Sequence, residues 1–360
     1  MDKLEKFVPP KSQETPDFLM FGVATYAHQI EQTDLNRIRN SFESLSADDT
    51  EWIKLVHAKL GIRKSLVESI TEGVERNSDF LNLLCQQSLP VVFPEPVPLT
   101  ENPPIERLEA LAGRVRSLPL VATRDWSSFS EEREITNRRL RETVSQYIDP
   151  QNGPILVPGS SSGRLVYEIA SLGYKVVGIE HDPLRVMLMH TILCGQHFSF
   201  SPYILDTCNR LKEDEHRILV QVPDVKIDPD VLSRISIDAN EFVESISSYP
   251  DNHFSSIVTS WFIDEPTIEL EKVMPEFQRV LKKGGVWINF GPLDYSYMGE
   301  KLAVNQTSVQ KRSLVELLEV VERSGFEVIE KSQVESSYLA NPTTIMKTVF
   351  TCLFFIARKQ

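Results

Sequence analysis

The chain has 360 residues, of which 41% are hydrophobic and 25% are charged, and its formal net charge at pH 7 is -13. This length and hydrophobic content exclude a disordered chain and allow one large domain with an accessory region. The acidic balance argues against a nucleic-acid-binding protein, which would present a basic face.

The four cysteines form no C-x-x-C pair, which argues against a disulfide framework and a zinc site and favours a reducing compartment. The first ten residues lack the apolar core of a signal peptide, and the longest apolar run, near 350–357, is too short to span a bilayer. We therefore expect a soluble protein of the cytoplasm, with the nucleus open as a second location. We expect no nucleic-acid or membrane partner, and we leave a homodimer open.

The N-terminal third is expected to be mostly helical. Residues 1–30 carry three prolines and are predicted to be irregular, whereas apolar residues at i, i+4 spacing predict helices over 34–86. Six prolines within 90–104 predict an extended connector rather than a helix, either flexible or packed on the surface. Two further helices are expected at 105–118 and 130–147.

From residue 155 onwards, predicted strands and helices alternate. The expected strands lie at 155–157, 175–180, 235–237, 254–264, 286–290, 326–334 and 350–358. The expected helices lie at 163–172, 183–194, 268–281 and 314–324, and residues 217–222 fit either a strand or a loop. Such alternation predicts an α/β fold, a mainly parallel seven-stranded sheet with helices on both faces. No helix separates the last two strands, so we expect one antiparallel strand at the sheet edge.

A glycine turn between the first strand and its helix predicts a cofactor site. Gly159 and Gly163 have G-x-x-x-G spacing, and Ser161 stands where the dinucleotide fingerprint has its second glycine, the one that admits a pyrophosphate. A ligand with ribose and adenine but no phosphates, such as S-adenosylmethionine, does not need that glycine. Glu180 follows 21 residues after Gly159 and is placed to accept hydrogen bonds from ribose hydroxyls. The alternatives are a plain tight turn and, for Glu180, a helix-capping carboxylate.

Four further residues fall at the same edge of the predicted sheet. Glu241 and Phe242 follow the third strand, where an acidic residue can bind the adenine amino group and an aromatic ring can cover the base, although Phe242 also fits ordinary core. Ser260, near the end of the strand at 254–264, is assigned to the cofactor. Asp264 ends that strand and faces either the crevice or, as an N-cap, the next helix.

Other chemistries are not indicated. The seven histidines contain no H-x-x-x-H pair, so we expect no bound metal. A phosphate-binding loop is absent from the sequence, which argues against a kinase. An NAD-linked oxidoreductase is a weaker alternative because the glycines that cradle phosphates are missing.

The fold expected here, with one reversed strand in a seven-stranded sheet, is the usual architecture of Rossmann-like class I methyltransferases that use S-adenosylmethionine. We expect this domain to cover residues 121–360. Residues 1–120 are predicted to form an accessory, mostly helical region that includes the proline-rich connector at 90–104.

From 123 to 359 the sequence resembles the carnosine N-methyltransferase family. The motifs that carry the resemblance are R-D-W-S at 124–127 with E-R at 132–133, V-P-G-S-S-S-G-R-L at 157–165, V-P-D-V at 222–225, F-I-D at 262–264 and G-G-V-W-I-N-F-G-P-L at 284–293. The family has glycine where this chain has Ser161. The resemblance implies transfer of a methyl group from S-adenosylmethionine to an imidazole nitrogen of a histidine-containing dipeptide, carnosine giving anserine.

The resemblance also implies roles for particular residues. The residues assigned to the cofactor are Arg124, Gly159, Gly163, Glu180, Glu241, Phe242 and Ser260, of which Glu241 replaces the family's aspartate. Asp264 is implied to be the catalytic residue that holds the substrate imidazole. The other residues assigned to the substrate are Tyr295, Ser296, Tyr338 and Phe350.

Some substrate positions depart from the family pattern. Ser296 stands where the family has a histidine, and Thr348 and Phe350 stand where it has tyrosines. These departures leave two alternatives open, a protein or peptide histidine methyltransferase and a catalytically degenerate methyltransferase fold that acts as a binding protein.

Overall fold

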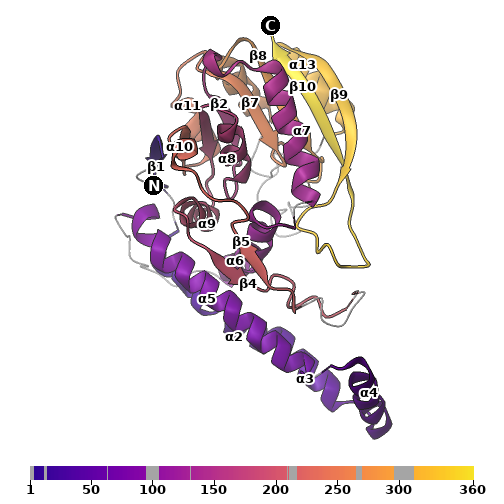
Figure 1. Ribbon diagram of the computed structural model, residues 1–360. Helices are drawn as coiled ribbons and strands as arrows, with labels where there is room; N and C mark the ends of the chain where they lie inside the picture. The colour runs from indigo at the N-terminus through magenta and orange to yellow at the C-terminus, as the bar shows by residue number, and fades with distance from the viewer. Residues whose placement is uncertain are drawn as a thin grey trace.

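We describe a computed structural model of the chain (Figure 1). The structure describes residues 4–11, 14–62, 64–94, 105–129, 131–208, 210, 217–264, 270–295 and 312–360, and every statement below refers to these residues. Within them, no helix combines the length and apolar character needed to cross a bilayer.

The main element is an eight-stranded sheet with the order β1-β6-β3-β2-β7-β8-β10-β9. Its strands are β1 (Lys6–Val8), β2 (Ile155–Pro158), β3 (Val176–Ile179), β6 (Ile235–Asp238), β7 (Phe254–Ser260), β8 (Leu281–Gly291), β9 (Phe326–Ser336) and β10 (Phe350–Lys359). β10 is antiparallel to both β8 and β9, and the other pairings are parallel. The expected seven strands with one reversed strand are therefore confirmed. The reversed strand was expected at the sheet edge, but β10 lies between β8 and β9, and β9 forms the edge.

The eighth strand, β1, lies outside the predicted seven. It pairs in parallel with β6, and the backbone N–H of Ala239 donates to the carbonyl of Val8 at 2.9 Å. The prediction that residues 1–30 are irregular was wrong, because this segment also contains α1 (Pro16–Ala24) and α2 (Tyr26–Ile30). Pro16 occupies the first turn of α1, where a missing N–H costs nothing.

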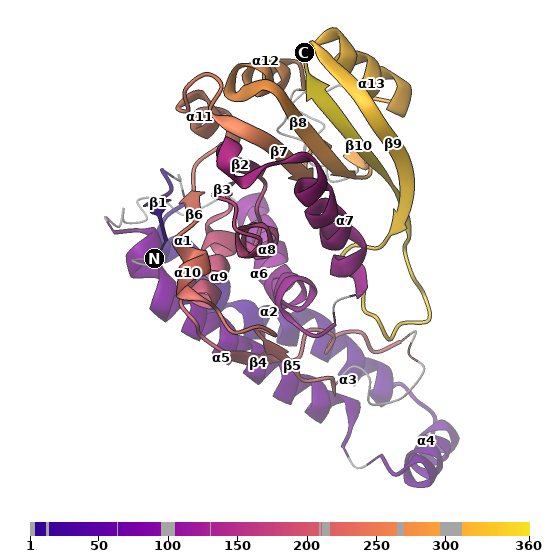
Figure 2. The same cartoon turned by 45° about the horizontal axis from the view of Figure 1, so that its top comes forward.

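Helices cover both faces of the sheet (Figures 1 and 2), as predicted. Alternate strand residues enter two hydrophobic clusters, as the pleat requires. Ile155, Val157 and Phe354 belong to one cluster, whereas Leu156 and Phe355 belong to the other. On the first face lie α7 (Glu131–Tyr147), α8 (Arg164–Ser171), α9 (Pro183–Leu193) and α10 (Pro229–Leu232), and on the second lie α11 (Phe242–Ser247), α12 (Leu270–Val280) and α13 (Leu314–Arg323).

Most of the N-terminal helices contribute residues to the hydrophobic cluster of the first face, but α4 (Ala47–Leu60) contributes none. After α1 and α2, the N-terminal helices are a short π-helix (Glu31–Leu35), α3 (Asn36–Glu43), α4, α5 (Leu66–Val92) and α6 (Ile105–Trp126). Figure 2 shows α4 at the far end of this helical layer, away from the sheet. A domain boundary between residues 120 and 121 would fall inside α6, and the division into two domains stays a prediction.

Two local predictions were wrong for identifiable reasons. The proline-rich segment was expected to exclude helix from residue 90, but α5 continues through Pro90 to the fully buried Val92, whose packing outweighs one lost backbone hydrogen bond. The segment at 282–285 was expected to end a helix, but it lies inside β8. Gly284 has φ +75°, and a Cβ on Gly285 would come within 2.8 Å of the Ser255 carbonyl oxygen, so these glycines serve an irregular strand pairing.

The segment left open between strand and loop contains β5 (Val220–Val222). It pairs antiparallel with β4 (Phe198–Phe200), which was not predicted, in a separate two-stranded sheet. This small sheet packs against α5 and α6 (Figure 1).

Candidate active site

The predicted site residues meet at the carboxyl edge of the sheet, beyond the ends of β2, β3, β6 and β7. One open cleft is lined by Gly159 after β2, Glu180 after β3, Glu241 and Phe242 after β6, and Asp264 after β7. Because parallel strands bring their carboxyl ends to one edge, residues far apart in the sequence reach the same cleft.

The backbone of the glycine turn lies so close to neighbouring side chains that a residue with a Cβ would clash at Gly159 or Gly163. Gly159 has φ +64°, and a Cβ there would lie 2.7 Å from Cδ2 of Phe262. Gly163 has φ +83° at the start of α8, and a Cβ there would lie 2.6 Å from Cγ of Met189. Gly159 lines the cleft, but Gly163 does not and instead closes the turn beneath α8.

Glu180 is buried and organises the turn. Its Oε2 accepts from the backbone N–H of Ser161 at 2.8 Å and its Oε1 from that of Asp182 at 2.9 Å. A carboxylate has about four acceptor positions, so two such bonds leave capacity for a ribose diol. The capping role considered for Glu180 belongs to Asp182, whose Oδ1 accepts from the N–H of Leu184 in the first turn of α9.

One part of the cleft wall is formed by the residues that follow β6. Glu241 is exposed and precedes α11 without a side-chain capping bond. Phe242 is 7% exposed and packs edge-to-face on Phe262, with ring centroids 5.1 Å apart. Phe242 is thus both a core residue and part of the cleft wall, so its two interpretations hold together.

Asp264 lines the same cleft. Its Oδ2 accepts from the backbone N–H of Asp294 at 2.8 Å. Burial, with a further contribution from the Asp264 charge, raises the pKa of Cys352 to about 12. Burial likewise raises the pKa of Tyr295, again with a contribution from Asp264. The alternative helix-cap role concerns residues 265–269, which lie outside the described residues.

Three aromatic side chains form the wall beside Asp264. The ring centroid of Trp261 is 4.7 Å from that of Tyr338 and 5.3 Å from that of Phe350, the latter edge-to-face. Trp261 has φ +52°, which turns the chain sharply after β7, and its N–H donates to the carbonyl of Phe290 at 2.8 Å. All three rings line the cleft. Trp261 was not predicted as a site residue, although its position at the strand end was a usable signal.

The remaining substrate assignments fall differently. Tyr295 is half-buried near Asp264 but is not among the residues that line the cleft. Thr348 is exposed just before β10. Ser296 lies outside the described residues, so its assignment stays a prediction.

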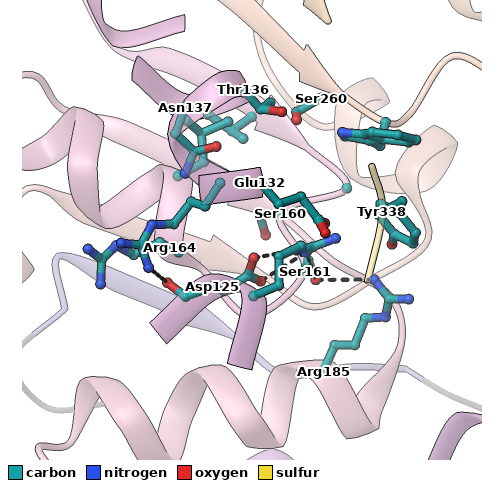
Figure 3. A pocket seen from close by; sticks show the side chains of 16 residues that line it. Asp125, Glu132, Thr136, Asn137, Ser160, Ser161, Arg164, Arg185, Ser260 and Tyr338 are labelled. Carbon is teal, nitrogen blue, oxygen red and sulfur yellow. Dashed lines mark hydrogen bonds and ion pairs between the residues drawn. The ribbon is translucent and has the colours of Figure 1, made fainter. Parts of the chain in front are cut away.

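A second, more polar cavity adjoins the cleft at the glycine turn (Figure 3). Arg124 and Ser260, both predicted to bind the cofactor, line it, and Gly159, Arg185 and Tyr338 line both cavities. Nε of Arg124 donates to Oδ1 of Asp125 at 2.6 Å, so the two side chains form an ion pair. Sequence reasoning assigned no role to Asp125, although it lies in the R-D-W-S motif at 124–127, or to Arg185, which belongs to none of the motifs named above.

The polar cavity fits a polar ligand group. Oγ of Ser160 and Nε of Arg133 are buried and have no hydrogen-bond partner among the described residues, and both residues line this cavity. Buried polar atoms in folded proteins are almost always paired. Together with the close backbone approach at Gly159 and the Glu180 carboxylate, they suit a ligand that joins a nucleoside to a polar tail, as S-adenosylmethionine does. Within the described residues, no group of three or more His, Cys, Asp or Glu side chains is placed to hold a metal ion.

The reversed strand β10, the glycine turn after β2 and the buried acidic residue after β3 define a Rossmann-like methyltransferase of class I. The chain belongs to the carnosine N-methyltransferase family, because the family model described as "Carnosine N-methyltransferase" matches residues 109–360.

Individual relatives agree with this assignment. A carnosine N-methyltransferase of Rattus norvegicus is 33% identical over 250 residues, which cover 66% of this chain and 60% of the relative. One of Schizosaccharomyces pombe is 26% identical over 357 residues, which cover 93% of this chain and 92% of the relative. The chain thus matches about three-fifths of the rat protein and nearly all of the yeast one.

Solved structures are more distant. The glycopeptide N-methyltransferase MtfA complexed with S-adenosyl-L-methionine shares 14% identity and a TM-score of 0.38, over 62% of this chain and 87% of that one. This likeness is too weak to support an inference.

Proposed function

We propose that this protein transfers a methyl group from S-adenosylmethionine to an imidazole nitrogen of a histidine-containing dipeptide such as carnosine. The observation that carries the proposal is that Glu180, Asp264 and Gly159 of the glycine turn line one cleft. One carboxylate is buried behind the turn, where a nucleoside ribose would bind. The other stands beside an aromatic wall, where a flat heterocycle would bind.

The cofactor supplies an electrophilic methyl group bound to a sulfonium sulfur. Gly159, Glu180, Glu241 and Phe242 would hold its nucleoside, since they line the cleft around the turn. Arg124 and Ser260 would hold its other end in the adjoining polar cavity.

On the substrate side, Asp264 would accept a hydrogen bond from one imidazole N–H. The free pKa of imidazole is about 6.5, so the ring is largely neutral near pH 7. A carboxylate on one ring nitrogen fixes the tautomer and leaves the lone pair of the other nitrogen free to attack. The same carboxylate stabilises the positive charge that develops on the ring, and the rings of Trp261, Tyr338 and Phe350 limit access of water.

The direct test is methyl transfer from labelled S-adenosylmethionine to carnosine, followed by mass spectrometry of the product. We expect methylated carnosine. A peptide with an internal histidine and blocked ends tests the protein-histidine alternative, which would gain if only that peptide were labelled. Calorimetry with S-adenosylhomocysteine tests the degenerate alternative, because a protein that binds cofactor and methylates neither acceptor would contradict the proposal.

A further inference from the structure

Two arginines converge on one hydroxyl group in the polar cavity. Nη1 of Arg185 lies 3.1 Å from Oγ of Ser161, and Nη2 of Arg124 lies 3.5 Å from the same oxygen (Figure 3). Arg185 comes from the first turn of α9 and Arg124 from the last turn of α6. Two cations from separate helices therefore meet at the glycine turn.

Ser161 is itself in an unusual conformation. Its φ is +51°, in the left-handed region that costs a non-glycine residue about 1 kcal/mol or more. The bond from its N–H to Glu180 holds it there. The family has glycine at this position, so the strain accompanies a hydroxyl that this chain has added. Backbone strain held in place by its surroundings is often associated with a functional site.

The same two guanidinium groups face the phenol of Tyr338. Cζ of Arg124 lies 4.8 Å from the centre of the Tyr338 ring. Burial alone would raise the pKa of Tyr338, but the charges of Arg124 and Arg185 outweigh it and hold this pKa below its ordinary value. The surroundings of the phenol oxygen therefore favour a negative charge.

The two arginines differ in how their charges are compensated. Arg124 makes two hydrogen bonds to the carboxylate of Asp125, at 2.6 and 3.0 Å. Arg185 makes a longer approach to Asp182 through Nε, at 3.7 Å, and that carboxylate also bonds to Arg114 at 2.6 Å. The charge of Glu180 also acts on Arg185, and the carboxylate of Glu180 accepts from the backbone N–H groups of Ser161 and Asp182. The Nη side of Arg185 is thus directed at Ser161 and the cavity.

We propose that Arg185 and Ser161, together with Arg124, form a binding subsite for a ligand carboxylate, in which Ser161 donates its hydroxyl and Arg185 supplies a second cation. Guanidinium groups are well suited to carboxylates because their N–H groups match the two oxygens. This inference rests on the proposed function, whose reaction offers two carboxylates, that of the cofactor's amino-acid end and that of a histidine dipeptide. Ser161 and Arg124 line the polar cavity, whereas Arg185 lines that cavity and the cleft.

Calorimetry with paired ligands tests the cofactor arm. S-adenosylhomocysteine and 5′-methylthioadenosine share the nucleoside and the thioether, but only the first has a carboxylate. We expect Arg185→Gln and Ser161→Gly each to lower the affinity for S-adenosylhomocysteine by about tenfold or more, the range of a hydrogen bond to a charged group. The affinity for 5′-methylthioadenosine should not change. Ser161→Gly suits the left-handed backbone, so loss of folding is not expected.

Carnosine and β-alanylhistamine, which is carnosine without its carboxyl group, test the substrate arm in the presence of S-adenosylhomocysteine. If Arg185→Gln lowers the affinity for carnosine but not that for β-alanylhistamine, the subsite binds the carboxylate of the dipeptide. The matched control is Arg107→Gln, which removes an exposed cation from the same cleft. Arg107 contacts the ring of Phe18 rather than Ser161. We expect Arg107→Gln to leave the affinities for both ligand pairs unchanged.

The outcomes separate the two proposals. Unchanged preference for the carboxylate in both ligand pairs and both variants would overturn the subsite, with the proposed function intact. Failure of the unmodified protein to bind either nucleoside would overturn the proposed function and the subsite with it.

Discussion

Replacement of Asp264 by asparagine is the sharpest test of the substrate side. The change keeps the size of the side chain and an oxygen that can accept from the N–H of Asp294, so the loop is expected to hold its conformation. It removes the charge that would face the imidazolium as it forms. Asparagine can also offer an N–H to the ring and so support the wrong tautomer.

The expected magnitude follows from Coulomb's law. Opposite unit charges about 4 Å apart interact by about 4 kcal/mol at an effective dielectric constant of 20, equivalent to about a thousandfold in rate. Asp264 is half-buried in an open cleft, so solvent screens part of this term. We therefore expect kcat for carnosine methylation to fall by about a hundredfold, with the affinity for S-adenosylhomocysteine unchanged.

The assay compares Asp264→Asn with Asp294→Asn, which removes another carboxylate that lines the same cleft. Only the first variant should lose turnover. A second readout confirms that the charge has been removed, because the pKa of the Cys352 thiol, about 12 with Asp264 present, should fall in Asp264→Asn. Near-normal turnover in that variant, with the thiol pKa lowered, would refute the role of Asp264.

Three further changes have defined outcomes. Glu180→Gln should weaken S-adenosylhomocysteine by about tenfold or more in calorimetry, since a neutral amide accepts ribose hydroxyls less well, and an unaltered affinity would reject the ribose assignment. Gly159→Ala places a methyl 2.7 Å from Phe262 at φ +64° and should lower the free energy of unfolding by about 1–3 kcal/mol, whereas a melting temperature equal to that of the parent would contradict the geometry. The pKa of Tyr338 is lowered in the folded state, so between that pKa and the ordinary value of 10 the unfolded chain binds more protons and this group makes stability rise with pH. Tyr338→Phe should remove that rise and the corresponding tyrosinate absorbance; an identical pH dependence in both proteins would count against the guanidinium effect.

The parallel sheet from residue 155 onwards was predictable because each of its strands is indicated by a local sequence pattern. The strands at 155–158 and 176–179 are short apolar runs that end at turn residues, and the order of such runs along the chain implies the parallel sheet. Gly159 and Glu180 could be assigned to one edge for the same reason, since each directly follows a strand. Asp264 was expected to end its strand, but β7 ends at Ser260 and Asp264 lies in the loop that follows.

The remaining features depend on contacts between distant segments. β1 has three residues and is held by pairing with β6, more than two hundred residues away in the sequence. Pro90 is accommodated because the end of α5 is buried, which its own sequence does not indicate. Arg185 reaches the site from a helix, and Trp261 reaches it through a positive φ, so neither follows from its spacing.

The packing of α5 on α9 has a practical consequence for shortened versions of this protein. Oγ of Ser88 in α5 donates to the carbonyl of Met187 at 3.0 Å and lies 2.9 Å from Nδ1 of His190, both in α9. A fragment trimmed to the family match at 109–360 would lack α5, expose the apolar back of α9 to water and loosen the helix that carries Arg185. Expression of such a fragment should therefore yield aggregation or weak ligand binding, and the full chain is the proper material for enzymology.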